Sequence, residues 1–136
     1  IQLINSCDSL ISTHRSEGFG LHLAEAMAMG KSVIATNWSG NTDFMNSKNS
    51  YLVDYKLVRL KKDFGPYRRN CHWAQPDEDH ALIQMKQVLE DEFSNPIKRS
   101  KKEIKLIREV HSIKRVASLI EQRIKIINHY LRINRK

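Results

Sequence analysis

The sequence contains few cysteines, and the two it has, Cys7 and Cys71, stand far apart in a chain of 136 residues. Isolated cysteines form neither a paired metal-ligand motif nor a disulfide framework, so the sequence predicts a protein of a reducing, cytoplasmic compartment. Long apolar runs are also absent. The longest span only a few residues, against the ~20 that a helix needs to cross a bilayer. We therefore expect no membrane-spanning helix.

The start of the chain lacks the features of a signal peptide. The segment Ile1–Asp8 has no basic residues followed by an apolar stretch. We expect this segment to be the end of a helix that belongs to a longer chain.

The composition bounds the size of the core and locates the charge. With 40% hydrophobic and 28% charged residues, the chain can bury one modest core, which excludes a large multidomain enzyme. The formal net charge is +8, but residues 1–54 carry −2 and residues 55–96 carry 0. Residues 97–136 hold 13 basic and 3 acidic side chains, a net +10. The whole basic excess therefore lies in the C-terminal tail.

The first third of the chain shows the pattern of a βαβ unit. Short β-branched segments at Ser9–Thr13 and Ser32–Thr36 predict strands. Between them, the polar loop His14–Gly20 leads into a helix at Leu21–Met29 that Gly30 ends. A strand, a helix and a second strand in this order predict a parallel sheet.

The rest of the chain predicts further strands and helices. We expect, in order, a helical turn at Asp43–Asn46, a strand at Tyr51–Asp54, a long loop at Lys56–Gln75, and helices at Asp77–Phe93, Ile97–Val110 and Ser112–Leu131. Three strands are few for a doubly wound sheet. The predicted fold is α/β, with the second half of a Rossmann-like domain in residues 1–96 and basic C-terminal helices in residues 97–136.

Two glutamates, Glu17 and Glu25, lie in the loop and helix that follow the first expected strand. Glu17 is at the carboxyl end of that strand, where open parallel sheets bind ligands. The loop amides from Gly18 to Leu21 lead into a helix N-terminus, which offers unpaired donors and a partial positive charge to an oxygen-rich ligand. The sequence therefore predicts an anion-binding site in this loop.

Glu25 stands among apolar helix formers, so burial of its carboxylate is costly unless hydrogen-bond donors meet it. A role in a site and a purely structural ion pair are both compatible with this position. Use of Glu17 and Glu25 as a hydrolase pair is disfavoured. On one continuous helix their Cα atoms would be ~12 Å apart, whereas hydrolase carboxyl groups need to lie ~5–9.5 Å apart.

The stretch Ser-Thr-His-Arg-Ser-Glu-Gly-Phe-Gly-Leu-His-Leu-Ala-Glu-Ala-Met-Ala-Met-Gly-Lys-Ser-Val-Ile-Ala-Thr at residues 12–36 resembles the signature of the retaining nucleotide-sugar glycosyltransferases of group 1, or family four. Its central element is a glutamate, seven residues and a second glutamate, matched by Glu17 and Glu25. Ser32 departs from the pattern, because a proline is usual there. The resemblance covers about residues 1–93. Three further segments are similar to bacterial members of the family: Trp38–Met45, Asn49–Val53 and Trp73–Asp77.

This family has the GT-B fold, and the resemblance implies roles for individual residues. Glu17 would be the catalytic residue that contacts hydroxyls of the donor sugar, and Glu25 would hold the nucleotide ribose. The loop amides would face the sugar and the diphosphate, which agrees with an anion site at a helix N-terminus. The expected donor-binding loop consists of Gly18, Phe19, Gly20 and Leu21, and the expected pocket lining of His14, Ser39, Gly40 and Asn41. For His14, a structural role is the alternative.

The resemblance also implies an activity. It is the metal-independent, retaining transfer of a hexose from a nucleotide diphosphate sugar to a glycan, lipid or protein acceptor, without a cofactor. GT-B enzymes place the acceptor domain, and an Arg/Lys pair that neutralises the diphosphate, before the segment matched here. Stabilisation of the leaving group would then be incomplete, so we expect this part alone to be inactive.

The last expected helix is basic and amphipathic. Lys114, Arg115, Arg123, Lys125 and Arg132 surround an apolar face made by Ile113, Val116, Ala117, Ile120, Ile124, Ile127 and Leu131. The favoured interpretation is that this face packs on the sheet or on a partner domain. The alternative is that it binds the inner face of an anionic membrane. A non-catalytic remnant or interaction module that uses these helices is the alternative function. Nucleic-acid binding is not expected, because no reading module and no interleaved aromatic residues are present.

Overall fold

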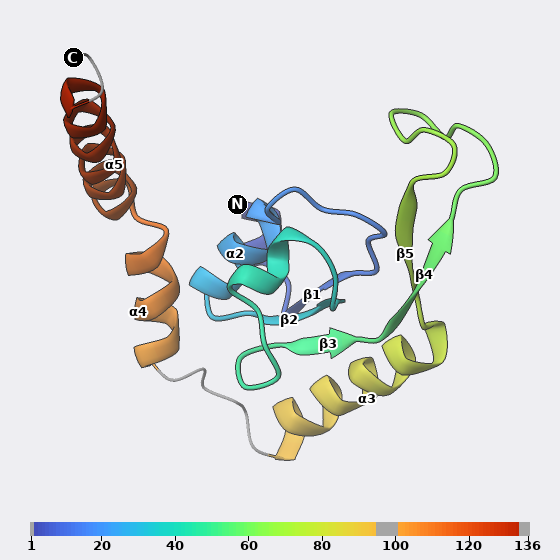
Figure 1. Cartoon of the computed structure of the whole chain (residues 1–136). Coiled ribbons are helices and arrows are strands. Elements are labelled where there is room, and N and C mark those ends of the chain that lie inside the picture. Colours follow the sequence, from blue (N-terminus) through green and yellow to red (C-terminus); the bar gives the residue numbers. More distant parts are fainter. Residues whose placement is uncertain (1, 95–100, 134–136) are drawn as a thin grey trace.

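The computed structural model describes residues 2–94 and 101–133 and shows an α/β fold with a three-stranded parallel sheet followed by C-terminal helices (Figure 1). The predicted fold class, a partial Rossmann-like sheet, is confirmed. In chain order the elements are α1 (Gln2–Asn5), β1 (Ser9–Ser12), α2 (Leu21–Ala28), β2 (Ser32–Thr36), the 3₁₀ turn η1 (Gly40–Asp43), β3 (Tyr51–Val53), β4 (Tyr55–Arg59), β5 (His72–Pro76), α3 (Glu78–Ser94), α4 (Lys101–Val110) and α5 (Ile113–Ile133).

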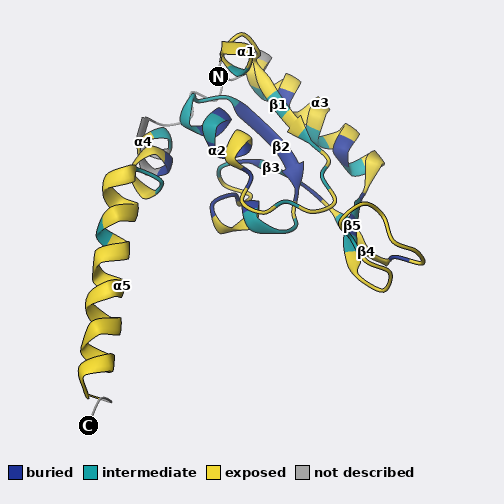
Figure 2. Ribbon diagram, turned by 90° about the horizontal axis from the view of Figure 1, so that it is seen from above, coloured by how far each residue is buried: buried dark blue, intermediate teal, exposed yellow. Residues whose placement is uncertain are grey.

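The parallel sheet has the order β1-β2-β3, as the βαβ pattern predicts. Ser9 of β1 pairs with Ser32 of β2, and Ile34 of β2 pairs with Tyr51 of β3. All five residues of β2 are buried, because this central strand is covered on both faces (Figure 2). β1 lies at an edge and alternates between exposed and half-buried residues.

Successive side chains of β2 point to opposite faces, and this divides the core into two clusters. Val33 and Ala35 face α2, whereas Ile34 faces α3. The buried cluster beneath α2 consists of Leu23, Ala24, Ala26, Met27, Val33, Ala35, Phe44, Met45 and Ile107. The smaller cluster beneath α3 consists of Ile34, Val53, Ala81 and Val88. The sheet is therefore a middle layer between helices.

Helix α4 completes the layer that contains α2. Ile107 belongs to the buried cluster, and the Arg108 Nε–H donates to the carbonyl oxygen of Ala28 over 2.9 Å. A Cβ placed on Gly30, which has φ +77°, would lie 3.0 Å from Ile104 Cδ1, so α4 packs closely on the end of α2. The predicted domain boundary after residue 96 and the first four residues of the helix predicted from Ile97 lie outside the described residues.

The prediction of a long loop at Lys56–Gln75 is wrong. β4 and β5 form an antiparallel two-stranded sheet in which Leu57 pairs with Ala74 and Val58 pairs with Trp73. The sequence of β4 lacks the alternation of apolar and polar residues that predicts a strand with one buried face. In the structure, its neighbouring residues Leu57 and Val58 are both exposed. Ladder hydrogen bonds and aromatic contacts hold this ribbon instead. Trp73 contacts Phe64 and Tyr67 edge-on, with ring centroids 5.3 and 6.0 Å away.

The helical turn predicted at Asp43–Asn46 is displaced toward the N-terminus. The structure has a 3₁₀ turn at Gly40–Asp43 instead, because the buried side chain of Asn41 donates back to the Thr36 carbonyl oxygen at the end of β2 (3.0 Å). Over residues 2–94 and 101–133, no helix combines the length and the hydropathy that crossing a membrane requires.

Candidate functional site

Two loops at the carboxyl ends of β1 and β2 lie in direct contact. The Glu17 carbonyl oxygen accepts hydrogen bonds from the Gly40 N–H (3.2 Å) and the Ser39 hydroxyl, and the Glu17 N–H donates to Ser39 Oγ over 3.1 Å. A Cβ on Gly40 would lie only 2.0 Å from the Gly18 carbonyl oxygen, so only glycine fits at this contact. The structure therefore joins the Gly18–Leu21 loop to Ser39 and Gly40.

His14 links the same two loops through both ring nitrogens. Nε2 lies 3.0 Å from the Trp38 carbonyl oxygen and 3.1 Å from Asn41 Oδ1. Both oxygens accept only, so Nε2 carries a proton, and Nδ1 lies 3.2 Å from the Ser12 hydroxyl. The ring thus has polar contacts at three points, and these contacts tie the loop after β1 to the loop after β2.

The Glu17 carboxylate folds over the donor-binding loop predicted from the sequence. Its Oε1 accepts a hydrogen bond from the Gly20 N–H over 3.2 Å, and the side chain is half-buried. Gly20, with φ +85°, is the residue before α2. Among the described residues, no group accepts a hydrogen bond from the backbone N–H of Phe19 or Leu21. A carboxylate and free amide donors therefore stand together at the start of α2, where the helix dipole favours anions.

Glu25 lies further along α2, between the buried residues Ala24 and Ala26, and is itself half-buried. The described part of the chain offers its carboxylate neither a hydrogen bond nor an ion pair. The structure thus brings Glu17, His14 and the second loop together, whereas within the described ranges no hydrogen bond or ion pair joins the Glu25 carboxylate to that network.

The N-terminal part of the chain, which contains the candidate site, matches a model of a protein family. The family model described as "Glycosyl transferases group 1" matches residues 1–59. The N-terminal part of the chain is therefore similar to the group 1 glycosyltransferases. No curated protein matches the chain. The matched segment holds every site residue predicted from the sequence, and it ends with β4, so it contains the whole three-stranded sheet.

Sequence reasoning missed the contact between the loop before α2 and the C-terminal part of the chain. The Phe19 ring lies 5.1 Å from both Phe44 and His111, measured between ring centroids, and His111 also meets Phe44 edge-on at 5.4 Å. His111 directly follows α4, 92 positions after Phe19. No local pattern could have revealed this pairing, because it depends on the packing of α4 against α2.

The β4–β5 ribbon also contacts the site from the side of His14. The Ala74 N–H donates a hydrogen bond to the Arg15 carbonyl oxygen over 2.9 Å. The Arg15 side chain donates from Nε to Gln75 Oε1 over 3.1 Å. The guanidinium carbon lies 4.9 Å from the centre of the Trp73 ring, a cation–π geometry. The loop after β1 is thus held by the ribbon on one side and by the loop after β2 on the other.

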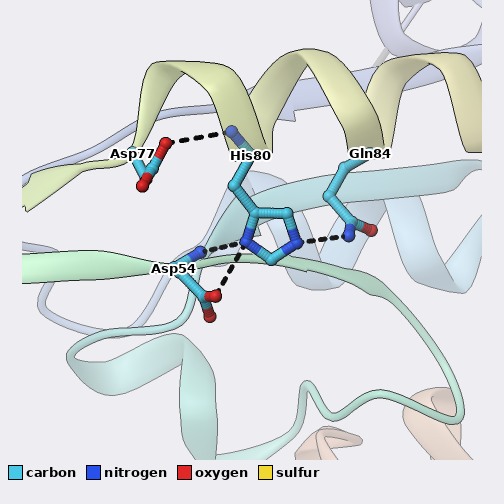
Figure 3. Close-up of polar contacts among 4 residues, drawn as sticks. All are labelled: Asp54, Asp77, His80 and Gln84. Carbon is cyan, nitrogen blue, oxygen red and sulfur yellow. Dashed lines mark hydrogen bonds and ion pairs between the residues drawn. The ribbon is translucent and has the colours of Figure 1, made fainter.

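A second polar cluster joins the end of β3 to the start of α3 (Figure 3). His80 Nδ1 lies 3.0 Å from Asp54 Oδ2, and His80 Nε2 lies 2.8 Å from the Gln84 side-chain amide. These residues line a cavity of about 590 Å³ beside β3. Their polar groups bond to one another, so we interpret the cluster as an anchor for α3. No group of three or more His, Cys, Asp or Glu side chains in the described ranges is placed to hold a metal ion.

Proposed function

We propose that the chain is the donor-binding part of a retaining glycosyltransferase that takes a hexose from a nucleotide diphosphate sugar without a metal ion. The observation that supports this most strongly is the Glu17 carboxylate beside the free amides of Phe19 and Leu21. A sugar diphosphate needs acceptors for its hydroxyls and donors for its phosphates, and this arrangement offers both.

Within this proposal the residues have separate roles. Glu17 accepts hydrogen bonds from hydroxyls of the donor sugar, and the amides of the loop bind the phosphates. Glu25 holds the nucleotide ribose, which would give its half-buried carboxylate the partners that the described residues do not supply. His14 and Asn41 do not touch the donor in this proposal. They position the loop after β2, which contacts Glu17 and Gly18.

The match to the glycosyltransferase family model does not favour the alternative of a non-catalytic interaction module. A further part of the proposal is that these 136 residues bind the donor but do not transfer its sugar to an acceptor, because the resemblance assigns the stabilisation of the leaving group to a pair of cations that the matched segment does not include. Release of nucleoside diphosphate in the presence of acceptor would contradict this part alone.

Calorimetric titration of UDP-, GDP- and ADP-sugars into the chain tests the donor site. The best binder should lose about tenfold or more in affinity on Glu17→Ala or Glu25→Ala, since hydrogen bonds to charged groups contribute about 1.5–3 kcal/mol. Glu90→Ala on the exposed surface of α3 is the matched control and should bind as the parent chain does. Unchanged affinity in both site variants would refute the assignment of the two glutamates.

A further inference from the structure

Helix α5 is the largest part of the described chain that nothing covers. It runs for 21 residues, Ile113–Ile133, and extends away from the α/β body (Figures 1 and 2). None of its residues is buried. The favoured prediction from the sequence is that its apolar face packs on the sheet or on a partner domain; packing on the sheet does not describe this structure.

The exposed surface of α5 is strongly apolar. Ile113 is 90% exposed, and a stripe at helical spacing continues along the helix. Its large apolar side chains, each at least 44% exposed, are Ile113, Val116, Leu119, Ile120, Ile124, Ile126, Ile127, Tyr130, Leu131 and Ile133. Soluble proteins rarely leave so continuous an apolar surface in water, and such surfaces mark interaction sites.

The charge of α5 identifies the kind of partner. The helix carries five basic side chains, Lys114, Arg115, Arg123, Lys125 and Arg132, and one acidic side chain, Glu121. A second copy of this chain would bring another helix of net +4 against it, so self-association is electrostatically unfavourable. An anionic lipid surface offers both the opposite charge and an apolar layer for the stripe.

The arrangement suits a helix that lies in the membrane surface rather than one that crosses it. Lys114 and Arg132 each follow a stripe residue by one position, about 100° around the helix. Their aliphatic stems can cover the edge of the apolar stripe while the charged groups reach the phosphates. The number of charges makes a crossing helix unfavourable, in agreement with the absence of a spanning segment among the described helices.

We propose that α5 binds the chain peripherally to anionic membranes, with its isoleucine stripe in the interface and its basic residues on the lipid headgroups. This binding does not depend on the donor site, because the residues of the stripe belong to α5 alone. The α/β body would then be held close to the lipid surface through the C-terminal helix.

The test is co-sedimentation of the full 136-residue chain with vesicles of phosphatidylcholine that contain phosphatidylserine, compared with phosphatidylcholine alone. The chain should bind the anionic vesicles, and binding should weaken as salt is raised. Lys125→Gln combined with Arg132→Gln should lower the partition coefficient about 25-fold, since each basic residue contributes about fivefold. Lys61→Gln combined with Lys62→Gln, which removes two exposed charges between β4 and β5, should leave it unchanged.

A second variant tests the apolar stripe. Ile120→Ser combined with Ile124→Ser should abolish sedimentation with anionic vesicles, while the unfolding temperature of the α/β body stays within a few degrees of the parent value, because both side chains are half exposed or more. The proposal is overturned if the parent chain does not bind anionic vesicles. It is also overturned if the chain forms a dimer without lipid that these serine substitutions dissociate.

Discussion

His14 Nε2 and Asn41 Oδ1 lie 3.1 Å apart, although 27 positions separate the two residues. Asn41 is fully buried, and its Nδ2 donates to the Thr36 carbonyl oxygen. One side-chain amide therefore connects the loop after β1 to the end of β2. This connection holds both loops of the proposed donor site in one position.

Asn41→Ala should lower the free energy of unfolding by about 2 kcal/mol, because it removes two hydrogen bonds of a fully buried side chain, one to the His14 ring and one to the Thr36 carbonyl oxygen, each contributing about 1 kcal/mol. Urea denaturation measures the change. Asn37→Ala is the control, since Asn37 is exposed, and it should change the free energy by less than about 0.5 kcal/mol. Equal losses in the two variants would contradict the importance of this connection.

Gly40→Ala should be strongly destabilising, by about 3 kcal/mol, because the new methyl group would collide with the Gly18 carbonyl oxygen and the backbone must move. Gly18→Ala is the matched control. A Cβ there meets nothing within 4 Å, and Gly18 is not among the residues with positive φ. Thermal unfolding should therefore show a large loss in the first variant and little change in the second. The reverse order would refute the close approach of the two loops.

His111→Phe should raise the free energy of unfolding by about 1 kcal/mol, because His111 Nε2 is buried and has no hydrogen-bond partner among the described residues. The phenylalanine ring would keep the edge contacts with Phe19 and Phe44. His129→Phe on the exposed face of α5 is the control and should have little effect. A clear destabilisation by His111→Phe in urea would show that the buried nitrogen has a partner.

Asp77→Ala should lower stability by about 1 kcal/mol, because Asp77 precedes α3 and its Oδ1 accepts from the His80 N–H over 3.0 Å (Figure 3). Asp79→Ala removes the same charge from the same turn without a hydrogen bond, so it should lose only about 0.3 kcal/mol. Circular dichroism during urea denaturation compares the two. Similar losses would indicate that charge at the helix start, rather than the cap, stabilises α3.

The βαβ unit could be predicted because its signals are local. β2 is a run of β-branched and small residues that is buried throughout, and Gly30 marks the end of the helix before it. The expected contact of Ser39–Gly40–Asn41 with the loop after β1 follows from the same reasoning, because parallel strands end at one edge of the sheet.

The remaining features depend on contacts between distant residues. β4 has no buried face, and the aromatic and cation–π contacts of Trp73 in β5 help to hold the ribbon. An asparagine in a turn is usually exposed, so the burial of Asn41 could not be read from its neighbours. The pairing of Phe19 with His111 needs α4 to be in place on α2.

The contact between Gly40 and Gly18 has a mechanical consequence. Because backbone touches backbone there, no side chain can rotate to absorb a displacement. A ligand that moves Gly18 would therefore also push on Gly40 and, through Ser39 and Trp38, on the Tyr55 ring, whose centroid lies 5.2 Å from that of Trp38. Occupation of the loop at the start of α2 would thus be transmitted as a rigid displacement to the base of the β4–β5 ribbon.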